Sequence, residues 1–291
     1  MAAYSPSRAY VLGVYLKRIL RWRRDSAPFL SIDAIANLAD VNVYPPRFRQ
    51  KPPTKAQIEK AEVIFCPSDR LIEFLDEFAG LINPKVIISG NSDHEFRAMP
   101  ENLPRSVKLL LLQNSYISDN RVIQTLPIGI ENFRFGVNGN PRLFHYSRIP
   151  AVARGRILIG PFGETHPLRK LVKDTFKNFS GNCVFLEGRI PPRKYRKLIS
   201  EEFEYIACVR GNGVDTHRLW ETLYRGRKPI LKKDEWLNSL HFLKPYIHTV
   251  SEWSLEELSR SETFKVDDFN PSQIPEIWMP YWRELISKSR N

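Results

Sequence analysis

Apolar runs and amphipathic stretches alternate along most of the chain. In the first half, short apolar runs at 62–66, 85–89, 107–113 and 121–127 predict strands, and a helical pattern at 69–81 lies between the first two. The third run, VKLLLLQ, is apolar without alternation, which is typical of a strand covered on both faces. Strands that alternate with helices indicate a parallel sheet with crossover connections.

The second half repeats this pattern more regularly, with five strand–helix pairs in succession. The predicted strands are 156–162, 183–188, 203–211, 228–231 and 247–251, and the predicted helices are 167–179, 193–200, 216–225, 236–243 and 255–261. Five such pairs predict a doubly wound sheet. We therefore expect an α/β protein with two Rossmann-like, doubly wound domains, over 1–150 and 151–265, and a C-terminal helical segment over 266–291. Its ligand should lie in the cleft between the domains, at the carboxyl ends of the strands.

The chain of 291 residues has a net charge of +12, which indicates an anionic binding partner. Residues 1–60 hold eleven Lys and Arg against four Asp and Glu, so most of the excess lies away from the predicted cleft. Because no recognised nucleic-acid-binding motif is present either, nucleic acid is a weak candidate. The three cysteines are far apart and show no ligand spacing, so neither a disulfide framework nor a bound metal is expected.

Residues 9–24 form a basic amphipathic pattern, with apolar side chains at helical spacing and five cations between 17 and 24. Two interpretations remain open: a surface helix with one face in the core, or a helix that docks on an anionic membrane. The longest apolar runs fall well below the ~18 residues of a membrane span. We therefore expect a cytoplasmic protein, peripheral on the inner face of a membrane if the second interpretation holds.

The strongest local signal is the run from a buried strand through R-G-N-G into a helix at 216–225. Glycines let a backbone approach a ligand closely, and the amides at a helix N-terminus attract phosphate. The turn alone can also explain the glycines, and Glu221 can be the ion-pair partner of Arg225 on a solvated face. The candidate ligand residues are Arg210, Gly211, Asn212, Gly213, His217, Arg218 and Glu221.

A second loop, GPFGETHPLRK at 160–170, also follows a strand and opens a helix. Thr165 is the expected N-cap, and Arg169 stands in the first helical turn. A cation at that position opposes the helix dipole unless an anion lies nearby, which favours Arg169 as a phosphate ligand. An exposed pair with Lys170 in solvent is the alternative.

In the first half, Asp93, His94 and Glu95 follow the strand at 85–89. Three titratable groups at the carboxyl end of a strand make this the candidate for a general base. A solvated turn is the competing interpretation.

The run CVRGNGVDTHRLWETLYRGRKPIL at 208–231 resembles the donor-binding region of exostosin-like glycosyltransferases and, more loosely, of α1,3-fucosyltransferases. LPIGIEN at 126–132 similarly resembles the link between the domains of bacterial polysaccharide transferases. This resemblance implies the GT-B architecture, with a nucleotide sugar bound by the C-terminal domain, the acceptor facing the N-terminal one, and no cofactor. It also implies that Arg218 and Glu221 lie near the nucleotide and its ribose, and that Arg169 lies near the diphosphate. The chain departs from the family in being short, with four predicted strands in its first half.

We therefore predict a metal-independent glycosyltransferase, with an inverting displacement preferred on family likeness alone. It would move a sugar from a nucleoside diphosphate to a hydroxyl of a glycan or a lipid-linked acceptor in cell-surface polysaccharide synthesis. Asp93, His94 and Glu95 are the candidate bases, and the residues of the two loops are the candidate donor ligands, Thr165 included. The alternatives are a nucleic-acid-binding or nucleic-acid-modifying protein and an inert sugar-nucleotide-binding protein.

Overall fold

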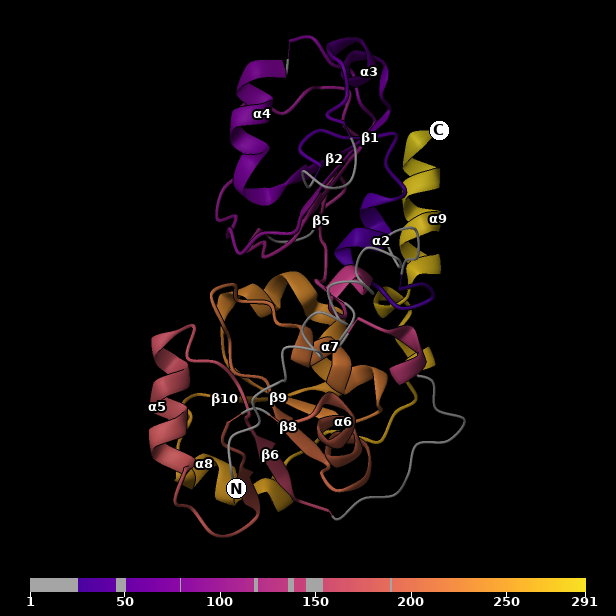
Figure 1. Cartoon of the computed structure of the whole chain (residues 1–291). Helices are drawn as coiled ribbons and strands as arrows, with labels where there is room; N and C mark the ends of the chain where they lie inside the picture. Colours follow the sequence, from indigo (N-terminus) through magenta and orange to yellow (C-terminus); the bar gives the residue numbers. More distant parts are fainter. Residues whose placement is uncertain are drawn as a thin grey trace.

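The computed structural model consists of two lobes, each built around a five-stranded parallel sheet (Figure 1). It describes residues 26–45, 51–78, 80–117, 120–135, 139–144, 154–188 and 190–291. The basic segment 9–24, predicted to be an amphipathic helix, and Ser118 and Asp119 lie outside the described residues. The α/β class predicted from the sequence is confirmed.

The N-terminal lobe contains the sheet β1-β2-β3-β4-β5, in which neighbours in space follow the order of the chain. Its strands are β1 (Val41–Asn42), β2 (Val63–Pro67), β3 (Val86–Gly90), β4 (Leu109–Leu112) and β5 (Ile123–Thr125). Among the strands that the structure describes this order does not reverse, so the first sheet does not show the doubly wound order that we expected. When every right-handed crossover connection leads to the next strand in the same direction, all the connections lie on one face of the sheet. Other segments must therefore cover the opposite face.

Those other segments come from both ends of the described chain. The helices α3 (Lys55–Lys60) and α4 (Leu71–Phe78) pack on one face of the first sheet, whereas α2 (Ile32–Ala36) and α9 (Met279–Arg290) pack on the other. Met279, Trp282 and Ile286 of α9 are buried against Val86 and Ile88 of β3. The last helix of the C-terminal segment thus packs on the first lobe, where it lies beside α2 (Figure 1), whereas Ile274 and Ile277 before it are buried in the core of the second lobe.

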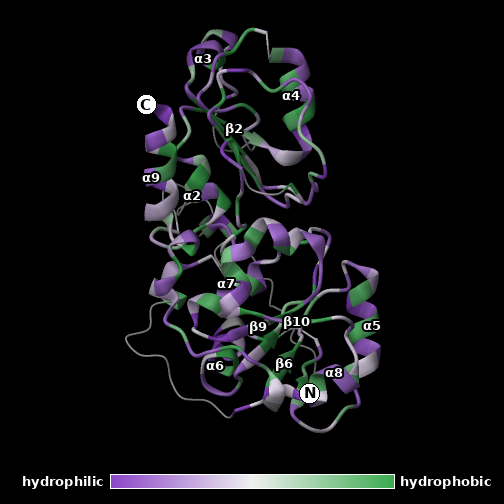
Figure 2. Ribbon diagram, turned by 180° about the vertical axis from the view of Figure 1, so that it is seen from behind, coloured by the Kyte–Doolittle hydropathy of each residue, from purple (hydrophilic) through white to green (hydrophobic). Residues whose placement is uncertain are grey.

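The C-terminal lobe contains the sheet β10-β9-β8-β6-β7, whose order reverses between β6 and β8. Its strands are β6 (Ile157–Ile159), β7 (Cys183–Phe185), β8 (Tyr205–Ala207), β9 (Lys228–Lys232) and β10 (His248–Val250), and its helices are α5 (Pro167–Phe176), α6 (Pro192–Glu201), α7 (His217–Tyr224) and α8 (Leu255–Ser259). Apolar clusters cover both faces, and Figure 2 shows hydrophobic residues concentrated on the strands of both sheets. This sheet is doubly wound, as predicted, and ligands of such sheets bind where the order reverses.

One predicted α-helix, at 236–243, is a 3-10 segment in the structure. The segment η4 (Glu235–Tyr246) begins at the N-cap Asp234 and is interrupted at Leu240, whose φ of −124° is not helical. Pro245, which has no amide hydrogen to donate, lies within it. The remaining 3-10 segments are η1 (Ser68–Arg70), η2 (Phe133–Phe135), η3 (Pro141–Leu143), η5 (Ser261–Thr263), η6 (Pro271–Gln273) and η7 (Pro275–Ile277).

The two lobes meet at the carboxyl ends of their strands. The Asp215 amide, after β8, donates to Asn114 Oδ1, after β4, at 3.1 Å. Ser239, after β9, donates to the Ser115 carbonyl at 2.8 Å. Loops from both sheets therefore face one another across the lobe boundary, and this is where the sequence places its candidate chemistry.

Candidate functional site

Arg169 forms hydrogen bonds with both loops that follow β6 and β8, the two strands between which the strand order reverses. Its guanidinium donates to the carbonyls of Arg210 at 2.9 Å, Gly163 at 3.1 Å and Val209 at 3.2 Å, and to Thr165 Oγ1 at 3.1 Å. Four of the five hydrogens that an arginine can donate are therefore used within the chain. Arg169 is therefore part of the loop architecture.

Gly211 is needed because this guanidinium packs against its backbone. A Cβ atom at Gly211 would lie 3.0 Å from Arg169 Nη2 and 3.3 Å from Thr165 Oγ1. The close approach that the sequence predicted at this glycine is thus made by an arginine of the chain itself. Neighbouring Asn212 is exposed and accepts from Arg210 Nη2 through its carbonyl at 3.2 Å.

His166, and not Thr165 as predicted, is the N-cap of α5. Its Nδ1 accepts a hydrogen bond from the Leu168 amide at 3.2 Å. Burial, together with the charges of Arg210 and Arg169, lowers the pKa of His166, which keeps the ring neutral and able to accept. The Thr165 hydroxyl is instead held by Arg169, which explains the displacement of the cap by one residue.

Arg218, in the first turn of α7, is a cation held next to the same loops. Its Nη2 donates to the Pro161 carbonyl, and its Nη1 is buried without a hydrogen-bond partner among the described residues. The guanidinium carbon lies 5.7 Å from the centre of the Phe162 ring and 5.4 Å from that of Tyr195. These two rings fix the position of the guanidinium.

Arg169 and Arg218 lie close enough to repel one another. Burial, followed by the charge of Arg218, lowers the pKa of Arg169 to about 10. Within the described ranges, neither arginine forms an ion pair with a carboxylate. Two cations therefore lie close together at the ends of two neighbouring strands, and the buried acidic side chain of Glu221 acts on Arg218.

Glu221 lies one turn further along α7 and is only 8% exposed. Burial raises the pKa of Glu221 to about 7, opposed chiefly by the charge of Arg225. The alternative of a solvated ion pair is therefore wrong, because this face of α7 is buried. The nearby Tyr195 hydroxyl is also buried, and it has no hydrogen-bond partner in the part of the chain that the structure describes.

Asp215 and His217 hold the C-terminal lobe to the link at 126–132. Asp215 accepts from the Ile128 amide and from Trp220 Nε1, both at 2.7 Å. His217 Nδ1 lies 2.8 Å from the Gly129 carbonyl, which can only accept, so Nδ1 carries the proton. Burial lowers the pKa of His217, so the neutral ring keeps a lone pair on Nε2. The sequence placed His217 among the donor ligands, whereas its observed contact joins the lobes.

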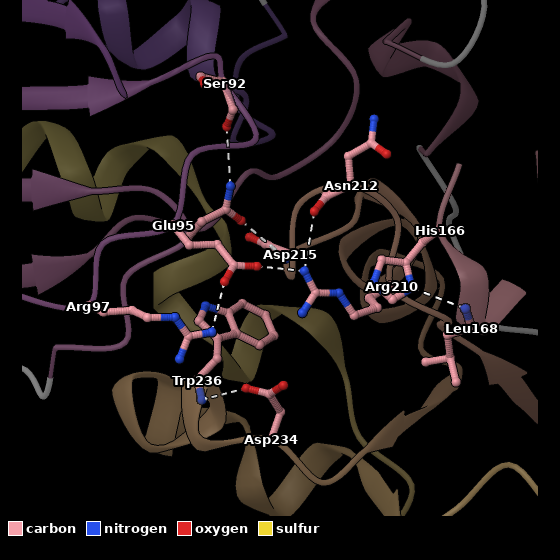
Figure 3. A network of polar contacts seen from close by, with 11 residues as sticks. Ser92, Glu95, Arg97, His166, Leu168, Arg210, Asn212, Asp215, Asp234 and Trp236 are labelled. Atoms are coloured by element: carbon pink, nitrogen blue, oxygen red, sulfur yellow. Dashed lines mark hydrogen bonds and ion pairs between the residues drawn. The ribbon is translucent and has the colours of Figure 1, made fainter. Parts of the chain in front are cut away.

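Glu95 pairs with Arg210 across the lobe boundary and with Arg97 of its own lobe (Figure 3). Its carboxylate lies 2.5 Å from Arg210 Nη2 and 2.9 Å from Arg97 Nη2. Burial favours the protonated form of Glu95, but hydrogen bonds from the two arginines outweigh it and lower the pKa. A carboxylate held in this way is a poor proton acceptor.

The other two members of the predicted cluster point elsewhere. Asp93 is exposed, and its Oδ1 would lie 3.1 Å from a Cβ atom at Gly213, so it faces the loop before α7. His94 is exposed and packs edge-on against Phe96, with ring centres 4.8 Å apart, in a cavity beside α4. The structure thus brings Asp93 and Glu95 to the lobe boundary and leaves His94 outside it.

A cavity of about 850 Å³ lies between the lobes, and most of its lining was not predicted. Arg97 and Tyr116 of the first lobe face Arg210, Lys233 and Lys244 of the second. Arg97, Tyr116 and Lys233 follow β3, β4 and β9, so their position after predicted strands was the available signal. Lys244 lies within η4, one residue beyond the helix that the sequence predicted at 236–243.

The described residues were also searched for a membrane span and for a metal-binding cluster. No helix among them combines the length and the apolar character needed to span a bilayer. They also contain no group of three or more His, Cys, Asp or Glu side chains placed to hold a metal ion.

The sequence was also compared with models of protein families and with curated proteins, and neither comparison finds a match. The two loops at the reversal in strand order and the cavity between the lobes therefore carry the functional argument.

Proposed function

We propose that the protein is a transferase that binds a nucleoside diphosphate sugar in the C-terminal lobe, where the strand order reverses between β6 and β8. The observation that carries the proposal is the pair Arg169 and Arg218, two neighbouring cations that form no salt bridge with a carboxylate of the described residues, although the charge of Glu221 acts on Arg218. They stand in the first turns of α5 and α7, which follow these two strands.

A diphosphate fits this arrangement for two physical reasons. Its negative charges relieve the repulsion between the guanidiniums, and the buried Nη1 of Arg218 gains an acceptor. The N-cap residue of α7, Thr216, makes no side-chain cap hydrogen bond, so the first turn of α7 can direct its amides to the same anion. In the transfer reaction, these donors would stabilise the charge that develops on the leaving diphosphate.

A sugar is the transferred group that the resemblance to exostosin-like transferases implies. In the GT-B arrangement of this proposal, the acceptor occupies the cavity between the lobes, and binding both substrates there supplies the proximity on which the rate depends. Of the three predicted bases, Asp93 fits best. Glu95 is held by two arginines, and His94 lies outside the lobe boundary.

The test is a thermal-shift panel of UDP, GDP, CDP, ADP and dTDP on the purified protein. A nucleotide at 100 times its dissociation constant stabilises the folded state by about 2.7 kcal/mol, which is readily detected. We expect one nucleotide to act in this way and Arg218→Gln to weaken it by about 1.5–3 kcal/mol, or roughly 10- to 150-fold in Kd.

The matched control is Arg193→Gln, which removes an exposed arginine from α6. It should leave nucleotide affinity unchanged. A panel in which no nucleotide raises the melting temperature would remove the transferase proposal. If nucleotide binds but the donor sugar is neither transferred nor hydrolysed, the protein is an inert binder instead.

A further inference from the structure

The cavity between the lobes has features that the proposed donor site does not use. With about 850 Å³, it has the size of a small-molecule site. Residues of both lobes line it, and four of them are cations: Arg97, Arg210, Lys233 and Lys244. A ligand here would contact both halves of the protein at once.

The two lysines supply the charge that is not neutralised within the chain. Arg97 and Arg210 share the carboxylate of Glu95. Lys233 and Lys244, by contrast, form no ion pair with any residue that the structure describes. The lining also contains two acidic residues, Asp234 and Glu235. Asp234 is the N-cap of η4 and accepts a hydrogen bond from the Trp236 amide at 2.9 Å.

Further hydrogen-bond donors line the cavity on the sides of both lobes. The Tyr116 hydroxyl is buried and makes no hydrogen bond of ordinary geometry within the described ranges. Burial raises the pKa of Tyr116, so the hydroxyl keeps its proton. The Arg97 guanidinium carbon lies 3.8 Å from the centre of the Tyr116 ring and fixes its orientation. Arg210 Nε is likewise buried without a partner in this part of the chain.

We propose that this cavity binds an acidic saccharide through a carboxylate or phosphate held by Lys233 and Lys244. That the ligand is a saccharide, the acceptor of the reaction, rests on the proposed transferase function, whereas the anion site itself does not. Tyr116 and Arg210 would donate to hydroxyls of the same saccharide, since sugars present many acceptors to neutral and charged N–H and O–H groups.

The experiment measures Kd by calorimetry, without nucleotide and at low ionic strength, for two matched pairs of probes. Digalacturonate is compared with the neutral disaccharide of the same linkage, and galactose 6-phosphate with galactose. The acidic member of at least one pair should bind about tenfold more tightly than its neutral counterpart. Which pair shows the preference identifies carboxylate or phosphate as the anion.

The double variant Lys233→Gln/Lys244→Gln should remove that preference and leave nucleotide binding unchanged. The control Lys232→Gln/Lys265→Gln removes the same charge outside the cavity lining, at exposed Lys265 and at Lys232, which pairs with Glu252 at 2.9 Å. It should change Kd by less than about twofold. Equal loss in both double variants, equal binding of acidic and neutral sugars, or no binding of either acid would overturn the inference.

Nucleotide binding is measured on the same proteins and separates the two proposals. If no nucleotide binds while the lysine-dependent preference for acid persists, the anion site stands and the transferase function fails.

Discussion

Replacing Glu221 with Gln removes a carboxyl group that the fold keeps buried in α7. Burial raises the pKa of Glu221 from 4.5 to about 7, against the attraction of Arg225. One pKa unit corresponds to 1.36 kcal/mol, so full ionisation of Glu221 in the folded chain costs about 3 kcal/mol. Because the folded-state pKa is the higher one, the stability that Glu221 contributes is complete below pH 4.5 and is lost as the pH rises towards about 7.

Glutamine has the shape of the protonated carboxyl and does not ionise. Glu221→Gln should therefore match the wild type at about pH 4.5 and exceed its free energy of unfolding by up to about 3 kcal/mol at about pH 8. It should also weaken nucleotide binding, because the family resemblance places Glu221 near the ribose. The protein would thus gain stability and lose affinity in the same variant.

Urea denaturation of both proteins across this pH range measures the difference, with Glu77→Gln on the exposed face of α4 as the control. Other buried groups, such as Asp215, titrate in both proteins and cancel. A stability difference that does not change with pH, or a variant less stable than the wild type at high pH, would refute the reasoning.

Two further predictions concern the lobe boundary. Asp93→Asn should reduce the transfer rate by about 10²–10⁴-fold and leave the nucleotide Kd unchanged, whereas Glu95→Gln should cause a smaller loss of rate. Steady-state kinetics of both variants tests this, and a larger loss in Glu95→Gln would make Glu95 the base instead. Trp220→Phe removes one of the hydrogen-bond donors to the buried Asp215 carboxyl group and should lower the free energy of unfolding by about 1–3 kcal/mol. A variant that melts like the wild type would mean that the remaining donors, such as the Ile128 amide, suffice.

The loops of the candidate site were predictable because they follow strands with a strong apolar pattern. Gly211 and Arg169 were singled out separately, and the structure brings them together because β6 and β8 are neighbours at the reversal in strand order. Adjacency in the sequence predicted shared surroundings less well than position after a strand did. Asp93, His94 and Glu95 are consecutive, yet the turn after β3 directs their side chains to different surroundings.

Other features depend on contacts that a local pattern does not contain. The two-residue strand β1 is too short for any periodicity, and the packing of α9 on the first sheet joins residues from opposite ends of the chain. The N-cap of α5 is His166 because Arg169 holds Thr165, and such competition for one hydroxyl follows from tertiary contacts alone. Lys244 reaches the cavity through a 3-10 segment that the helical pattern did not predict.

The most direct measurement is a crystal structure with the nucleoside diphosphate that the thermal-shift panel selects. The account predicts diphosphate oxygens about 2.7–2.9 Å from Arg218 Nη1 and from amides in the first turn of α7, between the ends of β6 and β8. A nucleotide bound anywhere else, such as among the lysines of the cavity between the lobes, would contradict it.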